Sequence, residues 1–211
     1  MYLKKSILLL IILMSLSLVL TLFLNDLLNI NILVVSSLSE YYTQTQIAEA
    51  LNSLQKWQWL SYAIIPLLLL LKISIIAAII DVGCFFFDKD IKYKNLFNTV
   101  IKAEFVFLLV IVFKTLWFYV FQQDYTLEDL QYFYPLSAIN ITGYDGLQPW
   151  FVYPLQVLNL FELAYWVILA YLLGKELKIS TDKGLTIVAS SYGVGLVIWV
   201  VAVMFLTLNM S

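Results

Sequence analysis

The sequence contains no histidine and no arginine, and its only cysteine is Cys84. Histidine is the commonest metal ligand and the usual proton carrier near neutral pH, and arginine supplies the forked donor that binds phosphate. One cysteine cannot form a disulfide within the chain. There is also no glycine-rich phosphate loop and no HExxH motif. We therefore predict that the protein is not an enzyme, holds no metal or other cofactor and has no nucleic-acid partner.

Charged residues of any kind are scarce. They make up 12% of the 211 residues, and hydrophobic residues make up 63%. An average soluble chain is roughly a quarter charged and about half apolar. These proportions are typical of an integral membrane protein that is surrounded by membrane lipids. The length suits a single membrane domain over residues 1–211.

Five segments are long and apolar enough to cross a bilayer as helices, which takes roughly 20 residues. They cover residues 6–24, 59–80, 103–121, 151–174 and 185–208. We interpret the first as an uncleaved helix, because no small-residue cleavage pattern follows it. The sequence thus predicts an all-α, polytopic fold with five transmembrane helices.

The lysines predict how these helices are oriented. With the N-terminus in the cytoplasm, every loop lysine except Lys56 lies on the cytoplasmic side, while Lys72 and Lys114 lie within spans. Short cytoplasmic loops of membrane proteins are enriched in lysine and arginine. We therefore expect a cytoplasmic N-terminus, an outside C-terminus and a location in the inner (plasma) membrane.

Two longer segments, 25–57 and 122–150, are expected outside the cytoplasm with short interfacial helices. Residues 39–56 have helical spacing, and TLED at 126–129 is a capping-box pattern that predicts a helix start. Four aromatic residues of the second segment fit either a membrane-interface belt or a partner-docking surface. These candidate partner-surface residues are Tyr132, Phe133, Tyr134 and Trp150.

Three charged residues lie well inside the predicted spans: Lys72, Lys114 and Glu162. At the rise of an α-helix, Lys72 lies about 22 Å and Glu162 about 18 Å from the outer ends of their helices. Because these depths match, we predict an ion pair between Lys72 and Glu162. Lys114, only about 10 Å deep, is expected to reach the outer headgroups or to approach the pair from above.

A polar stripe accompanies Glu162 along the fourth segment. Gln156, Asn159, Glu162 and Tyr165 recur every third residue, which places them on one face of a continuous helix. One interpretation is an internal network that holds helices together. Others are a substrate or proton pathway in which Glu162 changes protonation state, and contact with a partner's membrane helix. The sequence shows neither an inverted repeat nor paired broken helices, which disfavours a transporter.

Three motifs carry a family resemblance: NLF-x-x-x-x-W at Asn159 to Trp166, the turn KELKISTDKG, and YKNLFNTVIKAEFVFLLV leading into the third span. With them, mainly over residues 90–205, the chain resembles the Yip-type five-span membrane protein superfamily. The resemblance implies a membrane adaptor that contacts other integral membrane proteins.

Together these features favour a non-enzymatic, Yip-like scaffold or subunit of a larger membrane complex. The alternative is a small permease-like transport subunit with an intramembrane Lys/Glu site at Lys72 and Glu162.

Overall fold

The computed structural model describes residues 2–39 and 41–210, without the side chains of residues 2–5 and 61, so the Lys4 and Lys5 side chains lie outside the described part. Throughout those ranges the fold is all-α, as the sequence predicts. The elements are α1 (Tyr2–Leu27), α2 (Ile30–Ser39), α3 (Gln44–Phe86), α4 (Tyr93–Glu104), α5 (Val106–Leu116), η1 (Trp117–Phe121), α6 (Leu127–Tyr132), α7 (Ile139–Thr142), α8 (Pro149–Val157), α9 (Leu160–Leu177), α10 (Thr181–Val188), η2 (Ala189–Gly193) and α11 (Val194–Met210); η1 and η2 are π-helical turns.

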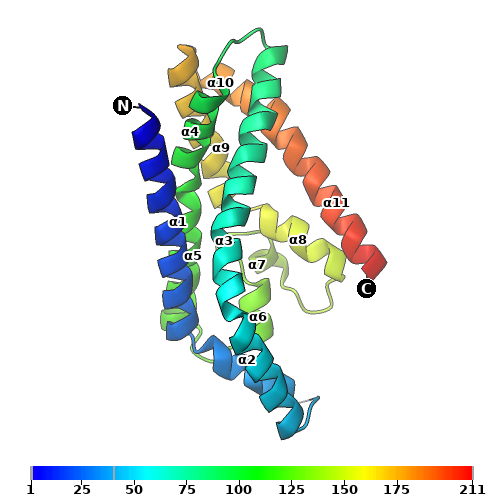
Figure 1. Cartoon of the computed structure of the whole chain (residues 1–211). Helices are drawn as coiled ribbons and strands as arrows, with labels where there is room; N and C mark the ends of the chain where they lie inside the picture. Colours follow the sequence, from blue (N-terminus) through cyan, green and yellow to red (C-terminus); the bar gives the residue numbers. More distant parts are fainter. Residues whose placement is uncertain (1, 40, 211) are drawn as a thin grey trace.

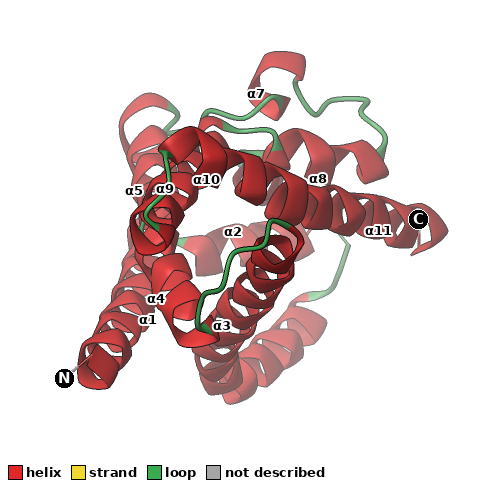
Figure 2. Cartoon of the chain, turned by 90° about the horizontal axis from the view of Figure 1, so that it is seen from above, coloured by secondary structure: helices red, strands yellow, loops and turns green. Residues whose placement is uncertain are grey.

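Within the described residues, four helical stretches are long and apolar enough to cross a membrane: Ser6–Leu27, Tyr62–Phe86, Tyr93–Phe121 and Thr181–Met210. In Figure 1, α1, α3 and the α4–α5 pair stand side by side, and α11 slopes away from them. The view from above shows α1 at the edge of the bundle and α11 leading outward on the other side (Figure 2). These helices are those of a membrane protein.

The segment 151–174, predicted as one continuous helix, is interrupted, and that prediction is wrong. Helix α8 ends at Val157 and α9 starts at Leu160, with an extended backbone at Asn159 between them (φ −139°, ψ 160°). The Asn159 side chain accepts a hydrogen bond from the Glu162 backbone N–H at 2.8 Å and so caps α9. Helix α9 has 18 residues and carries charged residues near both ends, and it is not among the stretches that qualify as membrane spans. Length and composition thus support four spans in the described part, and the fifth remains a prediction.

Of the two segments expected outside the cytoplasm, the first differs from its predicted helix and the second contains the helix that its sequence predicts. Residues 44–56 do not form a separate interfacial helix, because α3 runs without a break from Gln44 to Phe86. Helix α6 does begin after Thr126, where the TLED pattern predicts a helix, and the Thr126 hydroxyl accepts from the Asp129 backbone N–H at 3.1 Å.

Segment 122–150 folds back against the helices rather than extending beyond them. Figure 1 shows α6, α7 and α8 level with the lower halves of α5 and α11. The irregular backbone there is paired: Ala138 N–H donates to the Leu158 carbonyl at 2.9 Å, and Leu160 N–H donates to the Leu136 carbonyl at 3.1 Å. Such pairing is what permits non-helical backbone at membrane depth.

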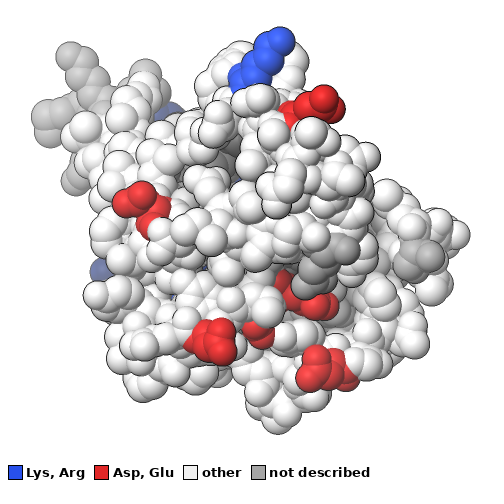
Figure 3. Space-filling view, turned by 90° about the horizontal axis from the view of Figure 1, so that it is seen from below, with Lys and Arg blue, Asp and Glu red and all other residues white. Residues whose placement is uncertain are grey.

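The main core lies at the end of the bundle where α3, α4, α9 and α10 meet. Ile73, Leu96, Leu169 and Ile187 are fully buried there. At Gly184 of α10 an added Cβ would collide with the backbone carbonyl of Ala170 in α9, so glycine permits the close approach of these two helices. The opposite end, seen from below in Figure 3, carries mainly acidic side chains.

Candidate functional site

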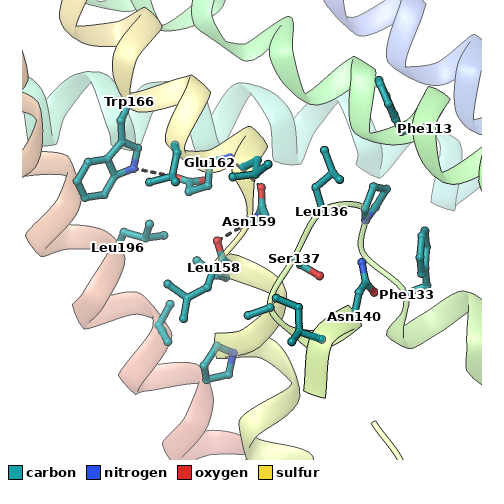
Figure 4. Close-up of a pocket in the computed structure, with 18 of the residues that line it drawn as sticks. Phe113, Phe133, Leu136, Ser137, Asn140, Leu158, Asn159, Glu162, Trp166 and Leu196 are labelled. Atoms are coloured by element: carbon teal, nitrogen blue, oxygen red, sulfur yellow. Dashed lines mark hydrogen bonds between the residues drawn. The ribbon is translucent and has the colours of Figure 1, made fainter. Parts of the chain in front are cut away.

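A groove of about 1020 Å³ lies at the break between α8 and α9. Its walls come from the end of α5 and η1, the segment 133–141, the α8–α9 junction and α11 (Figure 4). Most of the lining side chains are apolar, and the polar ones are Ser137, Asn140, Asn159 and Glu162. The groove is therefore an apolar space with a small set of polar groups gathered near one wall.

Glu162 is the one ionisable residue in this wall. It lies in the first turn of α9 and is half-buried. Its Oε1 atom accepts hydrogen bonds from the Trp166 indole N–H at 2.9 Å and from the Tyr192 hydroxyl at 2.7 Å. Both donors are neutral, and in the described part of the chain no lysine forms an ion pair with Glu162.

The local fold of η2 positions the groups around this carboxylate. Tyr192 and Gly193 lie in this π-helical turn, a type of turn that often occurs at functional sites. A Cβ added at Gly193 would lie 2.5 Å from Cη2 of Trp166. Glycine at this position therefore lets the Trp166 ring pack against η2 while its N–H reaches Glu162.

Asn159 fixes the other side of the helix break. Its Nδ2 atom donates to the carbonyls of Gln156 at 2.8 Å and Val157 at 3.0 Å, and its Oδ1 atom accepts from the Glu162 N–H. The residue is 6% exposed. Asn159 thus satisfies backbone groups on both helices that the break would leave unpaired.

The predicted ion pair between Lys72 and Glu162 is wrong. Lys72 Nζ donates instead to Glu104 Oε2 at 2.8 Å. Glu104 is 2% exposed, whereas the Lys72 side chain is 43% exposed. Sequence reasoning overlooks Glu104 because it is the second residue of the predicted span 103–121 and so is expected at the end of a membrane helix. In the structure the apolar helical stretch begins at Tyr93, and Glu104 lies within it.

Tyr165 lies between the Lys72–Glu104 ion pair and the groups around Glu162. It is fully buried, with its ring 4.9 Å from that of Phe107 and 5.4 Å from that of Tyr192, measured between centroids. Lys72 Nζ lies 4.1 Å from the centre of the Phe107 ring. Aromatic side chains therefore separate the Lys72–Glu104 pair from Glu162.

The remaining predicted polar residues have structural partners. The Lys114 ammonium donates to the Leu130 carbonyl in α6 and does not join the Lys72–Glu104 pair. Gln156 donates to the carbonyls of Gln131 at 3.2 Å and Tyr132 at 2.9 Å. The continuous stripe predicted from Gln156 to Tyr165 is wrong, because Gln156 lies in α8, Asn159 in the break, and Glu162 and Tyr165 in α9.

The four candidate partner-surface residues do not form an exposed patch. All of them are half-buried, and each has contacts within the chain. The centroid distances are 5.0 Å for Tyr132 and Tyr144, 5.3 Å for Phe133 and Trp117, and 3.8 Å for Trp150 and Phe151. Tyr134 packs against the main core, and burial, together with the nearby Glu162 carboxylate, raises the pKa of its hydroxyl.

None of the protein-family models, curated proteins or solved structures compared with this chain gives a significant match. The resemblance to the Yip-type superfamily therefore remains a prediction from sequence motifs.

Proposed function

We propose that this is a non-enzymatic, multi-pass membrane protein that binds an amphipathic molecule in the groove beside Glu162, as a small transport-type subunit. The groove at the interrupted helix is the observation that carries the proposal. Small-molecule pockets in proteins typically measure roughly 300–1,000 Å³ and combine apolar walls with a few polar groups. A groove of about 1020 Å³ with one carboxylate fits that description at its upper end.

The helix break adds weight to a transport-type role. Discontinuous helices at membrane depth commonly form the substrate sites of secondary transporters. The sequence disfavours a transporter because it shows neither an inverted repeat nor paired broken helices; the structure contains one interrupted helix, between Val157 and Leu160, which weakens the second of these arguments. We therefore place the transport-type role, which is the alternative from the sequence, ahead of the scaffold role.

The depth of Glu162 points the same way. Its partner Tyr192 lies within the stretch Thr181–Met210, about 16 Å along the helix from one end and about 27 Å from the other. Glu162 therefore belongs to the interior of the bilayer. Ionisable residues at such depth commonly mark a substrate or ion pathway.

The orientation and the membrane are part of the proposal. The acidic end in Figure 3 is taken as the outer face, and the lysine-bearing α3–α4 and α9–α10 connections as the cytoplasmic face. With a cytoplasmic N-terminus, we assign the chain to the inner (plasma) membrane.

A scaffold role in a larger membrane complex is the second candidate. It is favoured by two helical stretches that pack little against the rest of the protein, Ser6–Leu27 and Thr181–Met210. In each, 6% of the residues in an apolar 18-residue segment are buried, compared with 44% in Tyr93–Phe121. These two stretches offer long apolar faces to neighbouring membrane helices as well as to lipid.

Binding in the groove is tested with a fluorophore placed on α11. Val197 lines the groove and is 63% exposed; Ile198, its neighbour, is 65% exposed and does not line the groove. Val197→Cys and Ile198→Cys, each in a Cys84→Ala background, are labelled with bimane, reconstituted into nanodiscs and titrated with brominated single-chain amphiphiles.

We expect saturable quenching of the label at 197 by at least one amphiphile. Label 198, which faces away from the groove, should show only the linear quenching of a probe dissolved in the bilayer. Equal, non-saturating quenching at both positions for all probes would overturn the proposal.

A further inference from the structure

We infer that the groove selects lipophilic primary amines, molecules with an apolar body and one ammonium group, and that the ammonium binds the Glu162 carboxylate. The inference rests on the proposed function and names the class of ligand for the same site. Three features of the groove lead to it. The Oε2 atom of Glu162 accepts no hydrogen bond from the described residues, and no described cation forms an ion pair with this carboxylate. Most hydrogen-bond donors of the other polar groups are already bonded within the chain.

The Glu162 carboxylate has acceptor capacity to spare. Trp166 and Tyr192 both donate to Oε1, and no donor among the described residues contacts Oε2. An ionised carboxylate offers about four lone-pair positions on its two oxygens. The second oxygen can therefore accept a hydrogen bond from a ligand.

The charge of that carboxylate lacks a counter-ion within the described structure. The two donors that bind Glu162 are neutral, and the carboxylate lies at the N-terminal end of α9, where the helix dipole favours negative charge. Lys72, the nearest candidate cation by sequence depth, is engaged by Glu104. An ammonium ion in the groove would supply the missing positive charge, whereas an anionic ligand would be repelled.

Most hydrogen-bond donors of the other polar groups in the wall are already used, the exception being the second N–H of the Asn140 amide. The Ser137 hydroxyl and the Asn140 amide both donate to the Tyr134 carbonyl, at 2.6 and 2.7 Å. The Asn159 amide donates to the Gln156 and Val157 carbonyls. A ligand near Glu162 thus meets mainly oxygen acceptors, and it must bring most of the donors itself.

The rest of the groove suits the apolar body of such a ligand. Leu163 from α9 and Leu196, Val197 and Val200 from α11 line it. Figure 4 shows Leu196 on α11 across the open space from Leu136, with Glu162 near one end. An alkyl chain or apolar ring system fits this space with its ammonium group at Glu162.

The test uses the label at position 197 and three brominated probes of equal chain length: a primary alkylamine, the corresponding alcohol and the corresponding trimethylammonium. Each is titrated into nanodiscs that hold the parent, Glu162→Gln or Glu162→Asp. Alcohol binding reports whether the groove is intact in each variant, and label 198 corrects for partitioning into the bilayer.

In the parent we expect the amine to bind at least about tenfold more tightly than the alcohol, because charge-assisted hydrogen bonds are roughly twice as strong as neutral ones. The trimethylammonium, which has charge but no donor, should fall between them. Glu162→Gln should remove the amine preference while saturable alcohol binding persists, and Glu162→Asp should keep part of the preference.

Two results would overturn the inference while the proposed function stands: saturable binding of amine and alcohol with equal affinity, or an amine preference that survives Glu162→Gln. Absence of saturable binding by every probe would overturn the proposed function itself.

Discussion

At the scale of single residues, the two members of the Lys72–Glu104 pair differ in their surroundings. Glu104 is almost completely buried, whereas nearly half of the Lys72 side chain is exposed. Removing one partner of a buried pair is costly because it leaves the other charge without compensation. The cost should therefore depend on which partner is removed.

We predict that Lys72→Met destabilises the protein more than Glu104→Gln does, by up to about 3 kcal/mol, the lower end for breaking a buried pair. The double variant should recover much of the loss. Unfolding in detergent can be followed with a thiol-reactive dye, since Cys84 is the only cysteine and is 1% exposed.

The control for this prediction combines Lys72→Met with Glu162→Gln. If Glu104 is the partner, this second double variant should be no more stable than Lys72→Met alone. Recovery by Glu162→Gln rather than by Glu104→Gln would show that the structure assigns the wrong acid.

The sequence could predict that Lys72 needs a carboxylate, because a lone charge at this depth is unfavourable. It could not predict which one. The choice depends on how far the third membrane helix extends toward Tyr93, and short apolar runs do not define helix boundaries. The depth of Glu162 was a reasonable guide, but depth does not determine which faces of two helices meet.

At the scale of elements, the interruption at Asn159 is the main difference between prediction and structure. Its signal was present: NLFE at 159–162 places a capping residue three positions before an acid, as TLED does at 126–129. Helical periodicity across 151–174 concealed it. The three-residue spacing of Gln156 and Asn159 is compatible with one continuous helix and equally with a helix cap at Asn159.

We predict that Asn159→Ala destabilises the protein by about 1 kcal/mol or more, because it removes the cap of α9 and two hydrogen bonds to α8. Asn159→Asp keeps the capping oxygen and should lose less. The Cys84 dye assay measures both. Equal stability of Asn159→Ala and the parent would argue for an unbroken helix.

Asp129 in α6 gives a pH-dependent prediction outside the spans. Burial raises its pKa, but hydrogen bonds from Tyr144 and Thr126 outweigh burial and lower it below the ordinary 3.8. The same contact raises the pKa of Tyr144 to about 12. A lowered acid pKa stabilises the fold above about pH 4, and a raised tyrosine pKa stabilises it below about pH 10.

We therefore expect the parent to lose stability as the pH falls below about 4, where Asp129 takes up a proton and the favourable interaction is lost. Asp129→Asn should be less stable than the parent at pH 7 and should lose less on acidification. Thermal unfolding by circular dichroism checks this, with the neighbouring acid changed by Glu128→Gln as control. An equally shallow pH profile in both variants would contradict the role of Asp129.

At the scale of the whole molecule, composition alone gives the class of protein. Apolar content and run lengths predict a helical membrane protein, and the structure agrees in its all-α fold and its membrane-length helices. The inward folding of 122–150 could not be predicted, because it depends on backbone pairing of Leu136 and Ala138 with the α8–α9 junction. Sequence patterns do not reveal such distant pairing, and the groove depends on it.

The predicted orientation is checked with single cysteines in a Cys84→Ala background. Asp90 and Asp145 are exposed and lie in the α3–α4 and α7–α8 connections. We expect Asp145→Cys to react with a membrane-impermeant maleimide in intact cells and Asp90→Cys to react only after permeabilisation. The reverse pattern would invert the topology.

The central claim is that the groove at the α8–α9 break is a ligand site inside the membrane. Its most direct measurement is photo-crosslinking in nanodiscs with an alkylamine that carries a diazirine in its chain, followed by peptide mapping. The account predicts saturable labelling of the groove-lining residues, competed by unlabelled amine and reduced in Glu162→Gln; these are Leu163, Leu196, Val197, Val200 and Val201. Labelling spread evenly over the lipid-exposed faces of α1 and α11, without competition, would contradict it.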